Sequence, residues 1–234
     1  MKKGTTIITL ILSAIFIILL YNNLSKEGSA SYRMADITSS NDRSLGKQTQ
    51  HPESTYKVVI DPGHGGKDVG ATGASGRFEK EFTLQLARKV EELTEQETQL
   101  EVYLTRTEDQ FISSVERARP EFANQLGADL FISIHGNTYE DSSVAGTETY
   151  YYHDNSIILA ELMHKHIVKG VGFRDRGVKH EDFFVLKDTN MPAVLLEVGY
   201  LTNPQEEEDM LTEEVQTKMA SSILDGIKEY LELQ

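Results

Sequence analysis

The sequence predicts an α/β domain in which a twisted, mainly parallel sheet is flanked by helices in three layers. From residue 56 onward, short apolar runs alternate with longer amphipathic stretches, as strands and helices do in parallel α/β folds. A stretch of about 180 residues is long enough for one domain with its own core. With 39% hydrophobic and 26% charged residues, the composition is that of a globular chain.

Five apolar runs rich in Val, Ile, Leu, Phe and Tyr predict strands at residues 57–61, 100–105, 129–134, 147–152 and 193–198. The stretches between and after them predict helices at residues 79–96, 113–126, 156–169 and 213–232. The last helix has the clearest apolar face, repeating every four residues at Val215, Met219, Ile223, Ile227 and Leu231. Pro120 lies inside the second predicted helix and should kink or shorten it.

The N-terminal segment is predicted to direct the chain out of the cytoplasm. Lys2 and Lys3 precede 22 uncharged residues, and the apolar run at 7–21 has a length between a signal peptide and a spanning helix. A retained membrane anchor is favoured over a cleaved signal, and both stay open. The two lysines favour a cytoplasmic N-terminus. The expected organisation is an anchor or signal at 1–24, a flexible polar linker at 25–55 and a catalytic domain at 56–234.

Composition excludes several function classes. The chain has no cysteine, which rules out disulfide scaffolds, cysteine zinc sites and thiol nucleophiles. Its net charge is −14, and residues 55–234 carry 33 acidic against 17 basic side chains, a net charge of −16. Nucleic acid is therefore not an expected partner.

Chemically useful side chains follow three of the predicted strands. His64 comes shortly after the first strand, His135 directly follows the third, and Glu197 ends the apolar part of the fifth. Carboxyl ends of parallel strands share one edge of a sheet, and Glu79 follows a glycine-rich loop that can fold it back to that edge. Two histidines and a carboxylate suit catalytic zinc, and a further carboxylate can move protons.

Alone, each of these residues has a simpler reading. A histidine at a strand end is more often structural, and a glutamate at a helix start is usually favoured by the helix dipole. Glu197 differs, since a carboxylate directly after four apolar residues is expected to be partly buried and to need a partner or a function. The separations match no short zinc motif.

Longer segments carry a resemblance to a known family. These are IDPGHGGKDVGA at 60–71, GADLFISIHGN at 127–137 and VLKDTNMPAVLLEVGYLTNP at 185–204. With shorter matches between them, residues 57–232 resemble the zinc-dependent N-acetylmuramoyl-L-alanine amidases of the amidase-3 class, which hydrolyse bacterial cell wall. Gly136 departs from the Ala or Leu usual in that family, without removing a ligand.

The resemblance implies that His64, Glu79 and His135 hold Zn²⁺ and that Glu197 is the catalytic carboxylate. It implies hydrolysis of the peptidoglycan amide bond between the lactyl group of N-acetylmuramic acid and L-alanine of the stem peptide. A catalytically inactive peptidoglycan-binding protein and a zinc carboxypeptidase are the alternatives. The intact set of four residues argues against the first, and product masses separate the second.

Other residues carry weaker expectations. Asn137, Arg106 and Arg176 are candidate substrate-binding residues, with a salt bridge to an acid the simpler role for each arginine. Asp61 is a candidate acceptor for a ligand histidine. His164 and His166 are expected on the surface, and residues 206–209 as a solvated helix start.

Peptidoglycan is the expected substrate, with the membrane a partner if the anchor is retained and a protein activator also considered. The protein is expected to act outside the cytoplasm, either anchored to the membrane or secreted to the cell wall. The sequence does not decide between a vegetative role and one in sporulation or germination.

Overall fold

The computed structural model describes residues 55–233. The predicted hydrophobic helix at 1–24 and nearly all of the linker at 25–55 therefore lie outside the described residues. Within residues 55–233, none of the helices combines the length and the apolar character needed to cross a membrane.

Six strands form one mixed sheet with the order β2-β1-β3-β6-β4-β5. Neighbouring strands are parallel except β4 and β6, which pair antiparallel, so β4 and β5 run against the other four. The prediction of a mainly parallel sheet is thus confirmed in its central strands and corrected at one edge. The strands are β1 (Tyr56–Pro62), β2 (Leu100–Leu104), β3 (Leu130–Asn137), β4 (Thr147–Tyr151), β5 (Asp175–His180) and β6 (Ala193–Tyr200).

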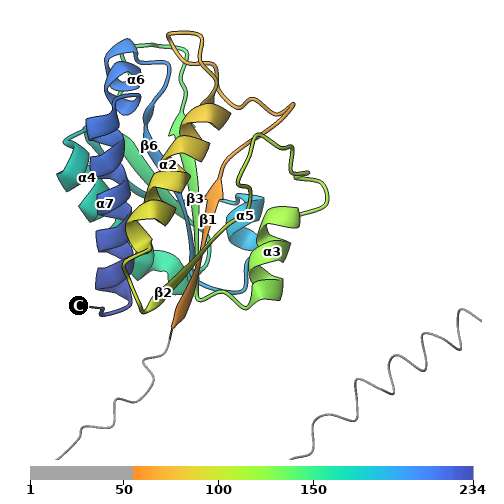
Figure 1. Ribbon diagram of the computed structural model, residues 1–234. Coiled ribbons are helices and arrows are strands. Elements are labelled where there is room, and N and C mark those ends of the chain that lie inside the picture. Colours follow the sequence, from red (N-terminus) through yellow and green to blue (C-terminus); the bar gives the residue numbers. More distant parts are fainter. Residues whose placement is uncertain (1–54, 234) are drawn as a thin grey trace, which may run out of the picture. The chain divides into compact units, whose positions relative to one another are not determined.

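Helices cover both faces of the sheet, as Figure 1 shows. The larger core lies beneath α2 (Glu79–Thr94), α4 (Ile157–Val171) and α7 (Glu213–Tyr230). The smaller core lies beneath α3 (Ala118–Leu126) and the short helix α5 (Phe184–Lys187). A 3₁₀ turn (Asp154–Ser156) precedes α4, and α6 (Pro204–Met210) follows β6. The three predicted layers are therefore present.

Helix α3 is shorter than predicted. It starts at Ala118 rather than near residue 113, which places Pro120 in its first turn, where a missing backbone N–H breaks no helical bond. Arg117, directly before it, has a left-handed backbone with φ 55°. The segment between β2 and α3 is consequently a loop, and this loop borders the cavity described below.

Strand alternation decides which polar side chains meet. Val59, Phe131 and Leu195 face the smaller core. Successive side chains of a strand alternate between faces, so Asp61, His135 and Glu197 lie on that same face further along β1, β3 and β6. The smaller core thus ends, at the carboxyl edge of these strands, in a row of polar groups.

Candidate active site

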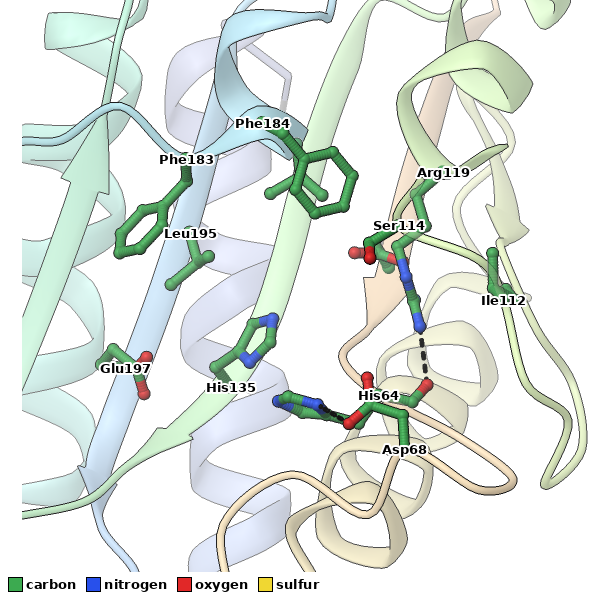
Figure 2. A pocket seen from close by; sticks show the side chains of 12 residues that line it. His64, Asp68, Ile112, Ser114, Arg119, His135, Phe183, Phe184, Leu195 and Glu197 are labelled. Carbon is green, nitrogen blue, oxygen red and sulfur yellow. Dashed lines mark hydrogen bonds and ion pairs between the residues drawn. The ribbon is translucent and has the colours of Figure 1, made fainter. Parts of the chain in front are cut away.

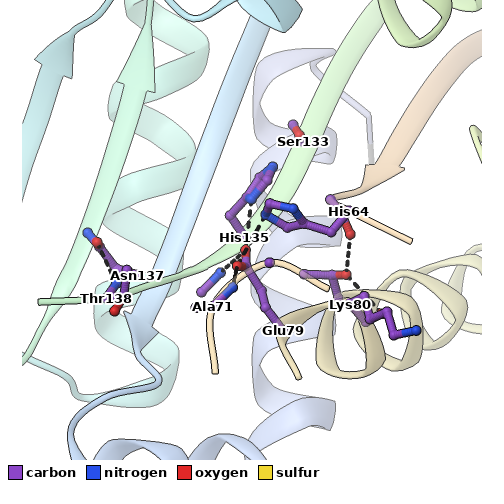
Figure 3. A network of polar contacts seen from close by, with 12 residues as sticks. His64, Ala71, Glu79, Lys80, Ser133, His135, Asn137 and Thr138 are labelled. Carbon is purple, nitrogen blue, oxygen red and sulfur yellow. Dashed lines mark hydrogen bonds and ion pairs between the residues drawn. The ribbon is translucent and has the colours of Figure 1, made fainter. Parts of the chain in front are cut away.

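Three predicted metal ligands converge at the carboxyl edge of the sheet. One potential ligand atom each from His64, Glu79 and His135 lies within 4.8 Å of the others. His64 follows β1, Glu79 begins α2 and His135 is near the end of β3, so the fold brings together residues from three separate elements, with Glu79 and His135 lying 56 positions apart (Figure 3). Two imidazoles and a carboxylate are a ligand set that fits a divalent cation.

Glu79 is the centre of this group. Its two oxygens lie 2.8 Å from Nδ1 of His135 and 3.1 Å from Nε2 of His64, and they also accept hydrogen bonds from the backbone of Ala71 and Gly136. Burial opposes ionisation, but hydrogen bonds from the two histidines outweigh it and hold the pKa of Glu79 well below its usual range. Glu79 is therefore an anion, the form that binds a cation.

Glycines let the backbone approach these ligands closely. A Cβ atom at Gly63 would lie 2.3 Å from Cε1 of His135, and one at Gly70 would lie 2.5 Å from Oε2 of Glu79. Gly70 also has a left-handed φ of +69°. The absence of side chains at these two glycines thus allows the backbone to lie close to His135 and Glu79.

Replacing Gly70 by Ala should therefore weaken metal binding by about 10- to 100-fold, the range seen when groups supporting metal ligands are changed. Gly76→Ala is the matched control, because Gly76 also has a positive φ of +85° but its added Cβ would meet nothing within 4 Å. Competition with a chromophoric chelator measures both affinities. Equal losses in the two variants would show that backbone strain, not crowding of Glu79, controls the site.

The loop that carries His64 is fixed by two buried arginines. Arg119 donates to the carbonyl oxygens of Pro62 and His64 and pairs with Asp61. Asp61 is fully buried and also accepts hydrogen bonds from Thr105 and Ser133. Burial acts against it, yet Arg119 and these hydroxyls lower the pKa of Asp61. The prediction that Asp61 accepts from a ligand histidine is wrong, because its partners are Arg119 and the two hydroxyl groups.

Arg106 is the second of these arginines. It is 1% exposed, and it donates to the carbonyl oxygens of Pro62, Gly63 and Lys80 at 2.9 to 3.0 Å. Burial lowers its pKa, and neighbouring Arg119 lowers it further. A guanidinium enclosed in this way cannot reach a substrate, so the prediction that Arg106 binds substrate is wrong. It supports the backbone before His64.

Glu197 lies beside the convergent ligands. It lines a cavity of about 280 Å³ together with His64 and His135. In Figure 2 the side chain of His135 lies between those of Glu197 and His64, and Phe183 and Phe184 lie above them. Its buried Oε2 atom has no hydrogen-bond partner among residues 55–233. Burial, with the charges of Glu79 and Glu148 added, raises the pKa of Glu197 well above its ordinary value. Such a carboxyl group is suited to take up a proton.

Glu148 on β4 is the site residue that sequence reasoning missed. It is 2% exposed and is the register partner of Glu197 across the antiparallel β4–β6 pair. Its carboxylate pairs with Arg176 and with Lys179. It also accepts hydrogen bonds from the hydroxyl groups of Tyr150 and Tyr200 and, at 3.3 Å, from the side-chain amide of Asn137. A lone acid inside the run TETYYY was the available signal.

Asn137 and Arg176, both predicted to contact substrate, thus meet on Glu148. For Arg176 the simpler reading, an ion pair with an acid, is realised, with Nε 2.6 Å from the carboxylate. Beyond this ion pair, Nη1 of Arg176 approaches the carbonyl oxygen of Ala145 at 3.5 Å. The side chain of Asn137 is oriented by Glu148 and by the backbone N–H of Thr138.

The charge of Glu148 should make part of the folding stability pH-dependent. Burial works against the shift, but hydrogen bonds from Tyr150, Arg176, Lys179 and Tyr200 lower the pKa of Glu148 to about 2. A lowered folded-state pKa gives stability that is present above the unfolded value, near 4.5, and lost as pH falls toward 2.

Glu148→Gln should consequently unfold more easily than wild type at pH 7, by about 3 kcal/mol, and the difference should shrink between pH 5 and pH 2. Urea unfolding at a series of pH values measures it, with exposed Glu140→Gln as the control. A difference that stays constant over this interval would contradict an ionic role for Glu148.

Two further expectations about surface residues are corrected. His164 is buried on α4, where its ring nitrogens meet the hydroxyl of Thr149 at 3.1 Å and the carboxylate of Asp175 at 2.8 Å. Glu206 and Glu207 are buried rather than solvated: Glu206 accepts from the backbone of Tyr200, and Glu207 from Ser75. These acids tie α6 to β6 and to the glycine-rich loop.

Comparison with known proteins matches the chain to one family. The model of the family described as N-acetylmuramoyl-L-alanine amidase, amidase-3, matches residues 58–229. The uncharacterised protein YqiI of Bacillus subtilis is 40% identical over 187 residues, which cover 78% of this chain and 88% of YqiI. The probable cell wall amidase LytH of Staphylococcus aureus is 35% identical over 186 residues, covering 77% of this chain but 60% of LytH.

Solved structures agree with the sequence comparisons. The catalytic domain of CwlV, an N-acetylmuramoyl-L-alanine amidase from Bacillus (Paenibacillus) polymyxa var. colistinus, has 45% identity and a TM-score of 0.75, covering 77% of this chain and all of that one. An N-acetylmuramoyl-L-alanine amidase from Clostridium difficile has 38% identity and a TM-score of 0.74, covering 76% and 98%. With a family match over most of the described domain and these relatives, the chain belongs to the amidase-3 family of N-acetylmuramoyl-L-alanine amidases.

Proposed function

We propose that the chain is a zinc amidase that cleaves the peptidoglycan bond between the lactyl group of N-acetylmuramic acid and L-alanine. The proposal rests on the convergence of His64, Glu79 and His135 beside a carboxyl group, Glu197, whose buried oxygen has no donor within the described domain. Bound at the three ligands, zinc would polarise the scissile carbonyl group and lower the pKa of a water molecule.

Glu197 has the proton-transfer role in this proposal. As a carboxylate it accepts the proton of the attacking water, and it then delivers that proton to the nitrogen of the leaving L-alanine. Burial raises its pKa, with the charges of Glu79 and Glu148 added, so the protonated form is stable enough to persist between the two transfers. Oε2 of Glu197 accepts no hydrogen bond from the part of the chain that the structure describes, so no such bond has to break before the proton is taken up.

The apolar wall of the cavity has a separate task. The cavity is lined, in addition to the polar groups, by Phe183, Phe184 and Leu195. These apolar side chains would exclude water other than the attacking molecule once a substrate is bound. Arg106 and Arg119 hold the backbone around His64 in place. Among the predicted substrate contacts, Asn137 and Arg176 remain in the proposal.

The cellular setting follows from the relatives and from the N-terminal sequence. Cell wall amidases act outside the cytoplasm, and residues 1–24 would provide a membrane anchor if retained or a secretion signal if cleaved. Residues 25–55 would act as a flexible linker to the catalytic domain at 56–234. A similar structure, CwlD of Clostridioides difficile, was solved in complex with the GerS lipoprotein, which supports considering a protein partner here.

The metal can be tested directly. We expect the purified chain to contain about one zinc per molecule, to lose amide hydrolysis on chelation and to regain it when zinc is returned. His135→Ala should lose the metal, whereas His166→Ala, which replaces a histidine paired with Glu229 instead, should keep it. Full activity of metal-free protein, or zinc retained by His135→Ala, would contradict the proposed centre.

A further inference from the structure

We propose that Arg176 and Lys179 of β5, held by the buried carboxylate of Glu148, bind a carboxylate group on the peptide part of the substrate. This inference rests on the proposed function and adds to it a preference for a negative charge on the peptide part of the substrate. Neither residue contacts the convergent metal ligands, and the two cations come from an edge strand that the sequence did not predict.

The charges of Arg176, Lys179 and Glu148 do not cancel. Glu148 pairs with two cations, through Nε of Arg176 at 2.6 Å and Nζ of Lys179 at 2.9 Å. One buried carboxylate neutralises only one of them, so the group has a net charge of +1. This positive group lies in a domain whose net charge is −16, and beside a site that contains Glu79 and Glu197. An anionic peptide would otherwise meet repulsion here.

The two cations are accessible to a ligand, although the acid that holds them is not. Glu148 itself is enclosed, whereas the side chain of Arg176 is 28% exposed and that of Lys179 is 41% exposed. Arg176 commits its Nε atom to Glu148, and its Nη1 atom makes only a 3.5 Å contact with a backbone carbonyl. The guanidinium edge and the ammonium group thus keep donors for a further acceptor, and carboxylates are their preferred partners.

Both cations are held in position before a ligand binds. Glu148 is held by the hydroxyl groups of Tyr150 and Tyr200, and each ring also lies beside one cation. The guanidinium carbon of Arg176 is 5.3 Å from the centre of the Tyr200 ring, and Nζ of Lys179 is 5.8 Å from that of Tyr150. Cations fixed before binding lose less side-chain freedom when an anion arrives.

Strand pairing connects the two cations to the cavity. Glu148 pairs in register with Glu197, and Tyr150 pairs with Leu195, both of which line the cavity. Lys179 pairs in turn with Tyr150 on the next strand. Two strand spacings separate β5 from β6, about 9–10 Å. An extended peptide covers about 3.3–3.6 Å per residue, so a carboxylate two or three residues from the scissile bond falls in this range.

The test compares two synthetic N-acetylmuramoyl tripeptides that differ only in whether all peptide carboxyl groups are free or amidated. Steady-state kinetics of the full chain are measured with each substrate for wild type, Arg176→Gln and Lys179→Met. Single variants are used because each leaves Glu148 one cationic partner. Lys218→Met is the control, since Lys218 pairs with Glu214 on α7 and carries the same type of charge elsewhere.

Wild type is expected to prefer the free-carboxylate substrate through KM. Each site variant should raise KM for that substrate about tenfold, the effect of losing one charge-assisted hydrogen bond, and leave KM for the amidated substrate unchanged. Lys179→Arg should restore the preference. Equal changes with both substrates would show a structural role only and overturn the inference, as would no change with either.

A calorimetric titration separates this inference from the proposed function. The released stem peptide, with free or amidated carboxyl groups, is titrated into the same proteins without any turnover. Weaker binding of the free-carboxylate peptide to Arg176→Gln than to wild type supports the site even if no hydrolysis is found. Cleavage by wild type combined with binding that is indifferent to amidation leaves the amidase intact and rejects the carboxylate site.

Discussion

Glu197→Gln is expected to lower kcat by about 10²- to 10⁴-fold, the usual contribution of a positioned acid–base group. Glutamine has the same shape and fills the same space, but it can neither accept the proton of water nor deliver it to the leaving amine. The change therefore removes proton transfer and leaves the cavity, with its apolar wall and the convergent ligands, in place.

The same substitution should not destabilise the protein. Burial, then the charges of Glu79 and Glu148, raises the pKa of Glu197, so the charged form is disfavoured in the folded state. A raised acid pKa means that stability falls as pH rises past the unfolded value, and glutamine avoids that loss. At pH 7 the variant should be at least as stable as wild type, in contrast to Glu148→Gln.

Metal content, urea unfolding and hydrolysis rates of the Glu197→Gln protein check both parts of this prediction. A decrease in kcat of less than tenfold would remove Glu197 from the chemistry. Loss of bound metal in the variant would give Glu197 a ligand role in place of the one proposed here.

Arg119→Met is expected to lower the free energy of unfolding by about 3–5 kcal/mol, since it leaves the fully buried Asp61 without its cation. Thr105 and Ser133 still donate to Asp61, but hydroxyl groups do not replace a full charge. The carbonyl of His64 also loses a donor, so metal affinity should fall together with stability.

Chemical unfolding of four proteins measures this effect: wild type, Arg119→Met, Asp61→Asn and the double variant. The double variant should lose less than the sum of the single losses, because removing both charges leaves no unpaired ion. Arg174→Met, which changes an exposed arginine, is the control and should be nearly neutral. Additive losses in the double variant would show that Asp61 and Arg119 act independently.

The convergent residues could be predicted from the sequence where local pattern and strand direction were sufficient. His135 and Glu197 follow apolar runs that are neighbouring parallel strands, so their meeting at one edge required only that β3 and β6 be adjacent. The loop glycines and the helix start at Glu79 brought the third ligand back by local geometry. The resemblance to a family then indicated which of the two glutamates is a metal ligand and which is the catalytic carboxylate. Residue types alone left that distinction open.

Other features could not be predicted from the sequence, because a long-range partner decides the structure that the residues adopt. Strand β5 was missed because its residues, DRGVKH, are polar and form an edge strand that buries little. The reversed direction of β4 follows from its pairing with β6, which no local pattern encodes. Arg106 was predicted to bind a substrate carboxylate because it ends a strand, whereas it donates to backbone carbonyl groups that include those of Pro62 and Lys80, more than twenty residues away in the sequence.

Mass spectrometry of fragments released from purified peptidoglycan tests the central claim most directly. The account predicts free stem peptides with L-alanine at the amino end and intact glycan strands carrying free lactyl carboxylates. Both should be absent with Glu197→Gln or after chelation. Release of single carboxy-terminal amino acids would instead indicate a carboxypeptidase, and binding without any released fragment under every metal condition would contradict amidase chemistry altogether.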